Sequence, residues 1–236
     1  MKSILTICRE VADLAAVKRP ESLFKSASAS DNIFLSVAQS ALDSLMRYGD
    51  WPELVKEAII EIIPQQHNYR LNSVCPDFYA LLPNTIYIKD TAEKVIGAIN
   101  PESWMKAKYF CDDNNIVKFK IQNNIINFLN LPDYPIKIVF QYHSSNICLE
   151  AKTFAEKSVL TADSDIPILD NYLVKLAILW RWLKRSGLDY SDEYNEYVQE
   201  IKKKFSSSSA GDDICLSSYT MDNLSTGVKI NVKVIH

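Results

Sequence analysis

Glycine is scarce in this chain, at 5 of 236 residues, where a share of about 7% is usual. Loops that cradle phosphate groups need glycines in clusters, and here Gly49, Gly97, Gly187, Gly211 and Gly227 stand far apart. The sequence therefore excludes the Walker and Rossmann types of nucleotide-binding loop.

Cysteine pairs at metal-binding spacing are also missing. The five cysteines (Cys8, Cys75, Cys111, Cys148 and Cys215) are dispersed and odd in number, and none forms a CxxC pair. This pattern predicts reduced thiols in a protein made in a cytosol, and it argues against both a disulfide framework and a structural zinc site.

The sequence has no excess of positive charge and no long apolar run. Its net charge is −3, and the best basic run, Lys202 to Lys204, has only three residues. A surface that binds the phosphate backbone usually needs more cations on one face, interleaved with aromatic residues, so we expect no direct sequence-specific binding of nucleic acid. We expect no membrane association either, because no segment approaches the roughly 18 apolar residues of a span and the first residues lack a signal-peptide pattern.

What the sequence does contain begins with two amphipathic helices. Apolar residues recur at helical spacing from Ile4 to Ala16, with Ser3 as the expected N-cap. A second helix is expected after Ser30 or Asp31, and Gly49 is expected to end it as a C′ glycine.

The pattern changes at Trp51-Pro52. Short segments rich in Ile, Val, Tyr and Phe follow, namely "AIIEII", "NYRLN", "TIYIKD", "VIGAI", "IVKFKIQ", "IINFL" and "IKIVFQYH". They predict an antiparallel β region over 52–159. Within it, Lys118–Leu129 is expected to form a hairpin that turns at Asn123-Asn124, and "NPESWMKAKYF" a short helix capped by Asn100.

Helical periodicity returns at Leu169 and runs to Gly187, and a last helix is expected after Ser191 with Lys202 to Lys204 in its final turn. The predicted fold class is α+β: a helical bundle formed by 1–51 and 160–205, and a β-rich domain over 52–159. Residues 206–236 are expected to be a serine-rich linker followed by a C-terminal arm. In that arm Val228, Ile230, Val232 and Val234 alternate with polar residues, which is typical of a strand.

The helix over 169–184 is apolar on two opposed sides. Leu169, Tyr172, Leu173, Leu176, Leu179, Trp180 and Leu183 form one stripe, and Val174, Ile178 and Trp182 lie nearly opposite. Two interpretations are open: a central helix of a monomeric bundle, or a helix between its own core and a neighbouring subunit. We favour the second, with Val174, Ile178, Trp182, Arg181 and Arg185 as interface candidates, because interface anchors are often Trp or Arg.

No catalytic constellation is apparent. The three histidines (His67, His143 and His236) lack the spacing of a metal motif, and the neighbours Ser144 and Ser145 do not by themselves make His143 a catalytic base. Asp163, Asp165 and Asp170 suggest either a divalent-cation site or, as we favour, a polar loop leading into a helix N-terminus. We therefore expect no enzyme activity, bound metal or cofactor.

Several stretches together resemble one family of structural proteins from short-tailed bacteriophages and prophages. They are "ILTICREVA", "RYGDWPELVKEA", "NPESWMKAK" and above all "LTADSDIPILDNYLVKLAILWRWLKRSGLDYSDEYNEYVQEI", and they cover roughly residues 1–205. The resemblance implies a head-to-tail adaptor of the tail tubular type, a ring of about twelve copies between portal protein and tail nozzle protein. It also implies a virion location in the neck and tail, with DNA passing through the lumen without sequence-specific binding.

This resemblance gives the terminal strand a role, because family members reach into the portal with their C-terminal tails. Val228, Ile230, Val232 and Val234 are the candidates for this docking arm, and pairing of the strand with the chain's own sheet is the alternative. Two other functions stay open: a different neck protein, such as a head-completion or stopper ring, and a phage-encoded cell-wall hydrolase.

Overall fold

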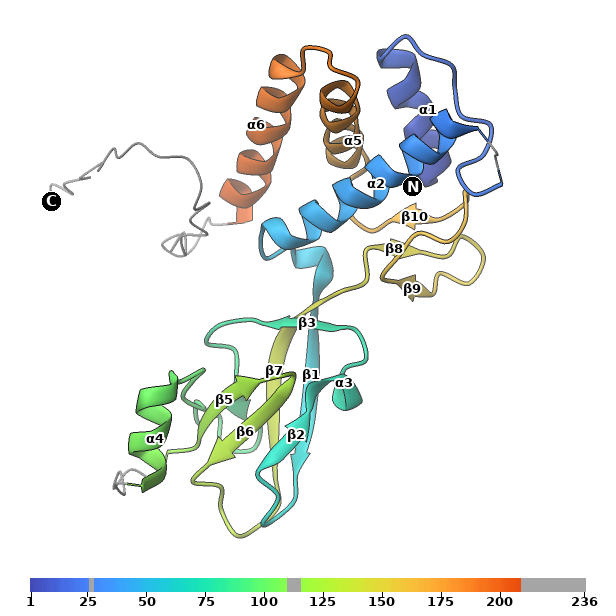
Figure 1. Cartoon of the computed structure of the whole chain (residues 1–236). Coiled ribbons are helices and arrows are strands. Elements are labelled where there is room, and N and C mark those ends of the chain that lie inside the picture. Colours follow the sequence, from blue (N-terminus) through green and yellow to red (C-terminus); the bar gives the residue numbers. More distant parts are fainter. Residues whose placement is uncertain (26–27, 110–115, 209–236) are drawn as a thin grey trace, which may run out of the picture.

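A computed structural model describes residues 1–25, 28–109 and 116–208. It confirms the α+β class, with a helical lobe and a β lobe stacked one above the other (Figure 1). The helical lobe contains α1 (Ile4–Leu14), α2 (Ala29–Tyr48), α5 (Asn171–Arg185) and α6 (Ser191–Ser208). No helix within these described ranges is long and apolar enough to cross a membrane.

The helix boundaries follow local sequence signals at most ends. Ser3 caps α1 as predicted, because its hydroxyl accepts a hydrogen bond from the backbone N–H of Thr6. Asp170 caps α5 by accepting from the N–H groups of Tyr172 and Leu173, so this helix begins two residues later than its apolar periodicity suggests. Helix α2 begins at Ala29, one residue before the predicted caps.

Gly49 ends α2 for a different reason from the one predicted. Its φ is 179°, which is extended backbone open to any residue, so the expected left-handed C′ glycine is wrong. A Cβ at this position would lie 2.7 Å from Cζ of Phe205 in α6. The glycine therefore allows α6 to approach the end of α2, where Phe205 also packs on Trp51 with ring centroids 4.7 Å apart.

Helix α6 extends further than the composition suggests. It runs to Ser208, so the serine-rich linker does not begin at residue 206, and Lys202 to Lys204 lie before the last turn. The strand candidates Val228, Ile230, Val232 and Val234 lie outside the described residues.

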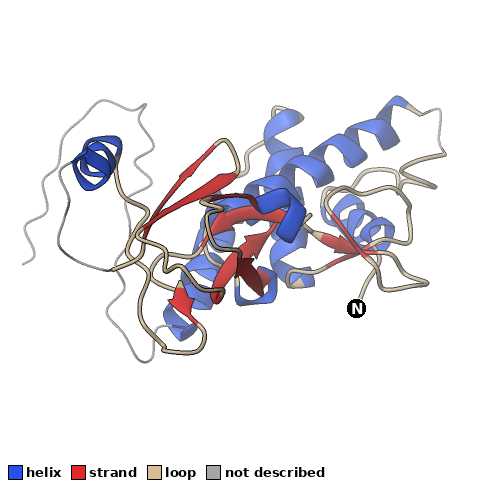
Figure 2. Cartoon of the chain, turned by 90° about the horizontal axis from the view of Figure 1, so that it is seen from below, coloured by secondary structure: helices blue, strands red, loops and turns tan. Residues whose placement is uncertain are grey.

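The β lobe is organised around the long strand β7 (Ile136–Ser144). On one side β7 pairs antiparallel with β1 (Val55–Ile62), from Val55 opposite His143 to Ile62 opposite Ile136. On its other side it pairs with β3 (Phe78–Leu81) and β4 (Tyr87–Ile88). A second sheet has the order β2 (Asn68–Arg70), β6 (Ile125–Leu129), β5 (Lys118–Gln122). The short helices of this part are η1 (Pro52–Leu54), α3 (Leu71–Val74) and α4 (Pro101–Tyr109), and α4 lies at the edge of the lobe (Figures 1 and 2).

The predicted hairpin and its neighbouring helix are confirmed. Asn123 and Asn124 both have positive φ, 53° and 58°, which is the two-residue turn that connects β5 and β6. Asn100 caps α4 by accepting from the N–H of Ser103. The segment "VIGAI" forms no named strand, only backbone hydrogen bonds and an isolated bridge between Ile96 and Lys118.

A small third sheet belongs to the helical lobe, contrary to the predicted domain boundary. It consists of β8 (Cys148–Leu149), β9 (Glu156–Lys157) and β10 (Ile166–Pro167), and it lies below α1 and α2 in Figure 1. Ile147, Cys148 and Leu160 are part of the hydrophobic core of the helices. The β lobe has its own core, which ends along the chain at Tyr142. The chain therefore returns to the helical lobe near residue 145 and not at 160.

Candidate interaction surface

Helix α5 is the centre of the helical lobe, and three helices (α1, α2 and α6) pack against it. Val174 and Ile178 are fully buried in the same core as Phe34 of α2. The indole of Trp182 stacks on the Phe34 ring, with centroids 5.7 Å apart and an angle of 18° between the planes. The second apolar face of α5 is thus covered by α2 of the same chain.

Because α2 covers this face of α5, part of the predicted subunit interface is wrong. Val174 and Ile178 have no exposed surface in a single chain, so neither can contact a neighbouring subunit. Trp182 and Arg181 are partly buried against the chain's own helices, and contact of their remaining surface with a neighbouring subunit stays a prediction. Of the five candidates, Arg185 alone is exposed.

Arg181 completes an aromatic cluster between α5 and α6. The ring of Trp180 lies 5.1 Å from that of Tyr194 and 5.9 Å from that of Tyr197. The Arg181 guanidinium lies 4.3 Å from the Trp180 ring centroid and donates from Nη1 to the carbonyl of Ala177. Burial lowers its pKa, although the neighbouring Tyr197 opposes this. Both tryptophans of the "WRW" run therefore face partners within the chain, Trp180 facing α6 and Trp182 facing α2.

An open groove lies along α5 between α1 and α6, on the stripe that sequence reasoning assigned to the bundle core. Its floor is formed by Leu176, Leu179 and Leu183. Leu14 from α1, Tyr172 and Lys175 from α5, and Glu193 and Glu196 from α6 complete the lining. The groove holds about 300 Å³. We call it the α1–α5–α6 groove.

The rim of the groove combines exposed apolar and charged side chains. Leu14 is 60% exposed and Tyr172 is 43% exposed, which is high for large apolar residues. The Tyr172 hydroxyl donates to Glu196, and this hydrogen bond raises the pKa of Tyr172. Lys175 Nζ lies 4.6 Å from the Tyr172 ring centroid. The groove is therefore suited to a partner that offers both an apolar and a charged group.

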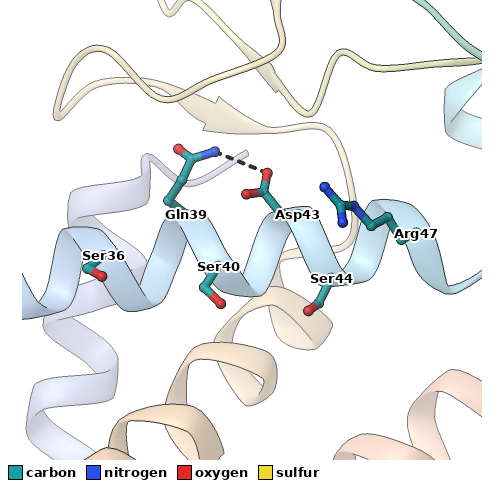
Figure 3. Close-up of a pocket in the computed structure, with 6 residues that line it drawn as sticks. All are labelled: Ser36, Gln39, Ser40, Asp43, Ser44 and Arg47. Atoms are coloured by element: carbon teal, nitrogen blue, oxygen red, sulfur yellow. Dashed lines mark hydrogen bonds between the residues drawn. The ribbon is translucent and has the colours of Figure 1, made fainter. Parts of the chain in front are cut away.

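A second pocket, of about 460 Å³, lies along the outer face of α2 (Figure 3). Its lining is entirely polar: Ser36, Gln39, Ser40, Asp43, Ser44 and Arg47. Gln39 Nε2 donates to Asp43, and the Gln39 side-chain oxygen accepts from the N–H of Leu160 in the loop before β10. Gln39 thus has a structural role, fixing that loop to α2.

The three aspartates considered as a cation site have separate structural partners. Asp165 is fully buried and accepts from Lys157 Nζ at 2.6 Å and from the N–H groups of Thr161 and Ala162. Asp163 accepts from Ser22 and the N–H of Leu23, and Asp170 caps α5. Within the described ranges no group of three potential ligands is placed to hold a metal ion. These contacts agree with the interpretation that the sequence favoured, a polar loop leading into a helix N-terminus.

The pair His143-Ser144 is likewise divided between different partners. Ser144 Oγ donates to Asp77 at 2.7 Å, whereas His143 Nε2 lies 3.5 Å from Asp50, too far for a good hydrogen bond. Both ring nitrogens of His143 are buried without a hydrogen-bond partner, and burial lowers the pKa of this residue, with Asp50 opposing the shift. The serine is therefore not activated by the histidine.

Asp77 is the centre of a polar cluster that joins the two lobes, which sequence reasoning missed. It accepts from Lys56, Ser144 and the Tyr142 hydroxyl in the β lobe. Asn146 donates to both Asp77 and Glu156, and Glu156 lies on β9 of the helical lobe. Burial raises the pKa of Asp77, but the hydrogen bonds from Lys56, Ser144 and Tyr142 outweigh it and hold this pKa at about 2. The charged carboxylate therefore stabilises the junction between the lobes.

The comparisons with known proteins add no relative to this description. No protein-family model matches the chain, and no curated protein matches its sequence.

Proposed function

We propose that this chain is a virion structural protein, the head-to-tail adaptor of a short-tailed bacteriophage. In this role about twelve copies form a ring between the portal protein and the tail nozzle protein. DNA passes through the lumen without sequence-specific binding, and the protein is made in the host cytoplasm and ends in the virion neck. The ring acts by assembly and performs no chemistry.

The observation that carries the proposal is the α1–α5–α6 groove. A subunit of a closed ring needs apolar surface outside its own core, because it contacts a neighbour on each side. The groove beside α5 offers Leu14 and Tyr172 as exposed apolar side chains at its rim, above a floor of leucines that belong to the chain's own core. The floor belongs to the "LAILWRWLKR" run, the part of the sequence on which the resemblance to adaptor proteins depends most strongly.

The two lobes provide separate surfaces for two further partners. The helical lobe and the β lobe have independent hydrophobic cores and are joined through the Asp77 cluster. An adaptor contacts the portal on one side and the nozzle on the other. In our proposal the helical lobes form the ring wall, and the β lobes face the tail.

The proposal is tested with purified full-length protein and purified portal rings. We expect the mixture to give ring-shaped particles with portal and adaptor stacked on one axis in electron micrographs. Leu14→Lys should prevent assembly of the subunits into a ring while leaving each subunit folded. Protein that stays monomeric at high concentration and shows no affinity for portal rings would contradict the proposal.

A further inference from the structure

The loop between β8 and β9 presents an aromatic ring to solvent in an unfavourable backbone conformation. Phe154 is 61% exposed and has a φ of 56°. Positive φ is uncommon for residues other than glycine, asparagine and aspartate, and for a bulky residue it is a genuine outlier. The conformation costs folding free energy and the exposed ring gains little from burial, so neither is explained by stability of the single chain.

Hydrogen bonds within the loop hold Phe154 in this conformation. Its backbone N–H donates to the carbonyl of Glu150 at 2.8 Å, and the N–H of Glu150 donates to the carbonyl of Ala155 at 2.8 Å. The N–H of Ala155 donates to the Thr153 hydroxyl at 3.2 Å. The loop backbone that carries the phenyl ring is thus held in place, so a partner can bind the ring with a reduced ordering cost for the loop.

The α1–α5–α6 groove has the properties needed to receive such a projection. Its exposed apolar surface comes from Leu14 and Tyr172, above a buried leucine floor, and its volume of about 300 Å³ exceeds that of a phenyl ring. Phe154 and the groove residue Leu14 are both largely exposed, so they do not cover each other within one chain. A projection and a complementary hole at different places on one chain make a heterologous contact, which closes into a ring or extends into a filament.

The charges beside the two features are complementary. Lys152 is exposed next to the projection, and it has no ion pair among residues 1–25, 28–109 and 116–208. Glu193 and Glu196 line the groove on the α6 side. Glu193 likewise has no ion pair within the part of the chain that the structure describes, so a cation from a second copy meets an available carboxylate.

We propose that Phe154 of one copy inserts into the α1–α5–α6 groove of the next copy, with Lys152 facing Glu193. This inference rests on the proposed ring and identifies the contact that builds it. In Figure 1 the β8–β9 hairpin lies on the side of the helical lobe away from α6, so the projection and one wall of the groove are at different edges.

The first test is Phe154→Gly, which removes the ring and suits the positive φ. We expect the melting temperature of the subunit to rise by about 2–4 °C and its self-association to weaken at least about tenfold. Tyr134→Ser is the control, because Tyr134 is 63% exposed in a different loop and should leave association unchanged. Unchanged self-association of Phe154→Gly, whatever its melting temperature, would overturn the inference.

Charge reversal provides a second and independent test. Lys152→Glu and Glu193→Lys should each weaken self-association several-fold, and the two changes together in one chain should restore most of the loss. Restoration requires that the two residues meet between copies. Losses that simply add in the double variant would contradict the proposed pairing.

A cross-linking experiment separates this inference from the proposed function. With Phe154→Cys in one chain and Leu14→Cys in another, mild oxidation of the mixed ring should give a disulfide between the two positions. If rings form on portals but Leu14→Cys cross-links instead to residues 209–236 or to the portal, this contact is wrong and the adaptor function stands. If the wild-type chain forms no ring on portals, the proposed function fails.

Discussion

Trp182 of α5 stacks on Phe34 of α2 within a single chain, with ring centroids 5.7 Å apart. This contact closes the side of α5 that sequence periodicity assigned to a neighbouring subunit. On the opposite stripe Leu176 and Leu179 are buried as well, and of these groove residues of α5 Tyr172 is exposed. The helix is therefore a central helix of the bundle, and the groove along it is the surface available to a partner.

The stacking predicts that Trp182→Ala lowers the stability of the subunit. Loss of the indole should cost about 3 kcal/mol of unfolding free energy, because a large side chain packed on a buried ring is removed. Trp182→Phe should recover part of this loss by preserving ring contact with Phe34. Urea unfolding of the two variants checks the prediction, and a change below about 0.5 kcal/mol for Trp182→Ala would mean that the stack is unimportant.

Leu14→Lys should affect association and not folding. Leu14 is 60% exposed at the end of α1, where a cation suits the helix dipole, so we expect the melting temperature to change by less than about 2 °C. The charge would, however, stand at the rim of the apolar groove. Sedimentation velocity should show a loss of self-association for Leu14→Lys.

Met105→Lys is the matched control for this change. Met105 is 53% exposed on α4 in the β lobe, and the same substitution there should leave self-association as in the wild type. Equal behaviour of the two variants would argue against the groove as the subunit contact.

The Asp77 cluster predicts a stability change at acid pH. The pKa of Asp77 is lowered from 3.8 to about 2 in the folded chain, so its contribution is complete above about pH 4 and is lost as the pH falls towards 2. The contribution is on the order of 2 kcal/mol. Asp77→Asn should flatten the dependence of unfolding free energy on pH between 4 and 2, measured by denaturant titration. The same slope in both proteins would place the acid sensitivity elsewhere.

Divalent cations should leave the stability unchanged. Asp165 is saturated by Lys157 and two backbone N–H groups, and Asp163 by Ser22 and Leu23, so these carboxylates have other partners than a metal. Millimolar calcium or magnesium should therefore not raise the melting temperature in scanning calorimetry. A rise that disappears in Asp165→Asn protein would restore the cation site as an explanation for the acidic loop.

The sequence predicts well those features that depend on a few neighbouring residues. Ser3 caps α1 and Asn100 caps α4, because a cap is a contact between residues two or three positions apart. The turn at Asn123-Asn124 is of the same kind, since both residues tolerate positive φ.

Features that depend on distant segments were not predictable in this way. Periodicity shows that α5 has two apolar sides, but the position of Phe34, far away in the chain, decides which side is covered. The strands β8 and β10 have two residues each, too few to show a sequence pattern. The predicted boundary between the lobes was wrong for this reason. The Asp77 cluster unites residues from 56 to 156, and no local signal connects them.

We propose that the α1–α5–α6 groove is the contact between neighbouring copies in a ring. It is tested most directly by electron cryomicroscopy of the full-length chain assembled on portal rings. We expect a ring in which a neighbouring copy fills the groove beside Leu14 and Tyr172 of every subunit. A ring in which this groove faces solvent, or a chain that stays monomeric beside the portal, would contradict it.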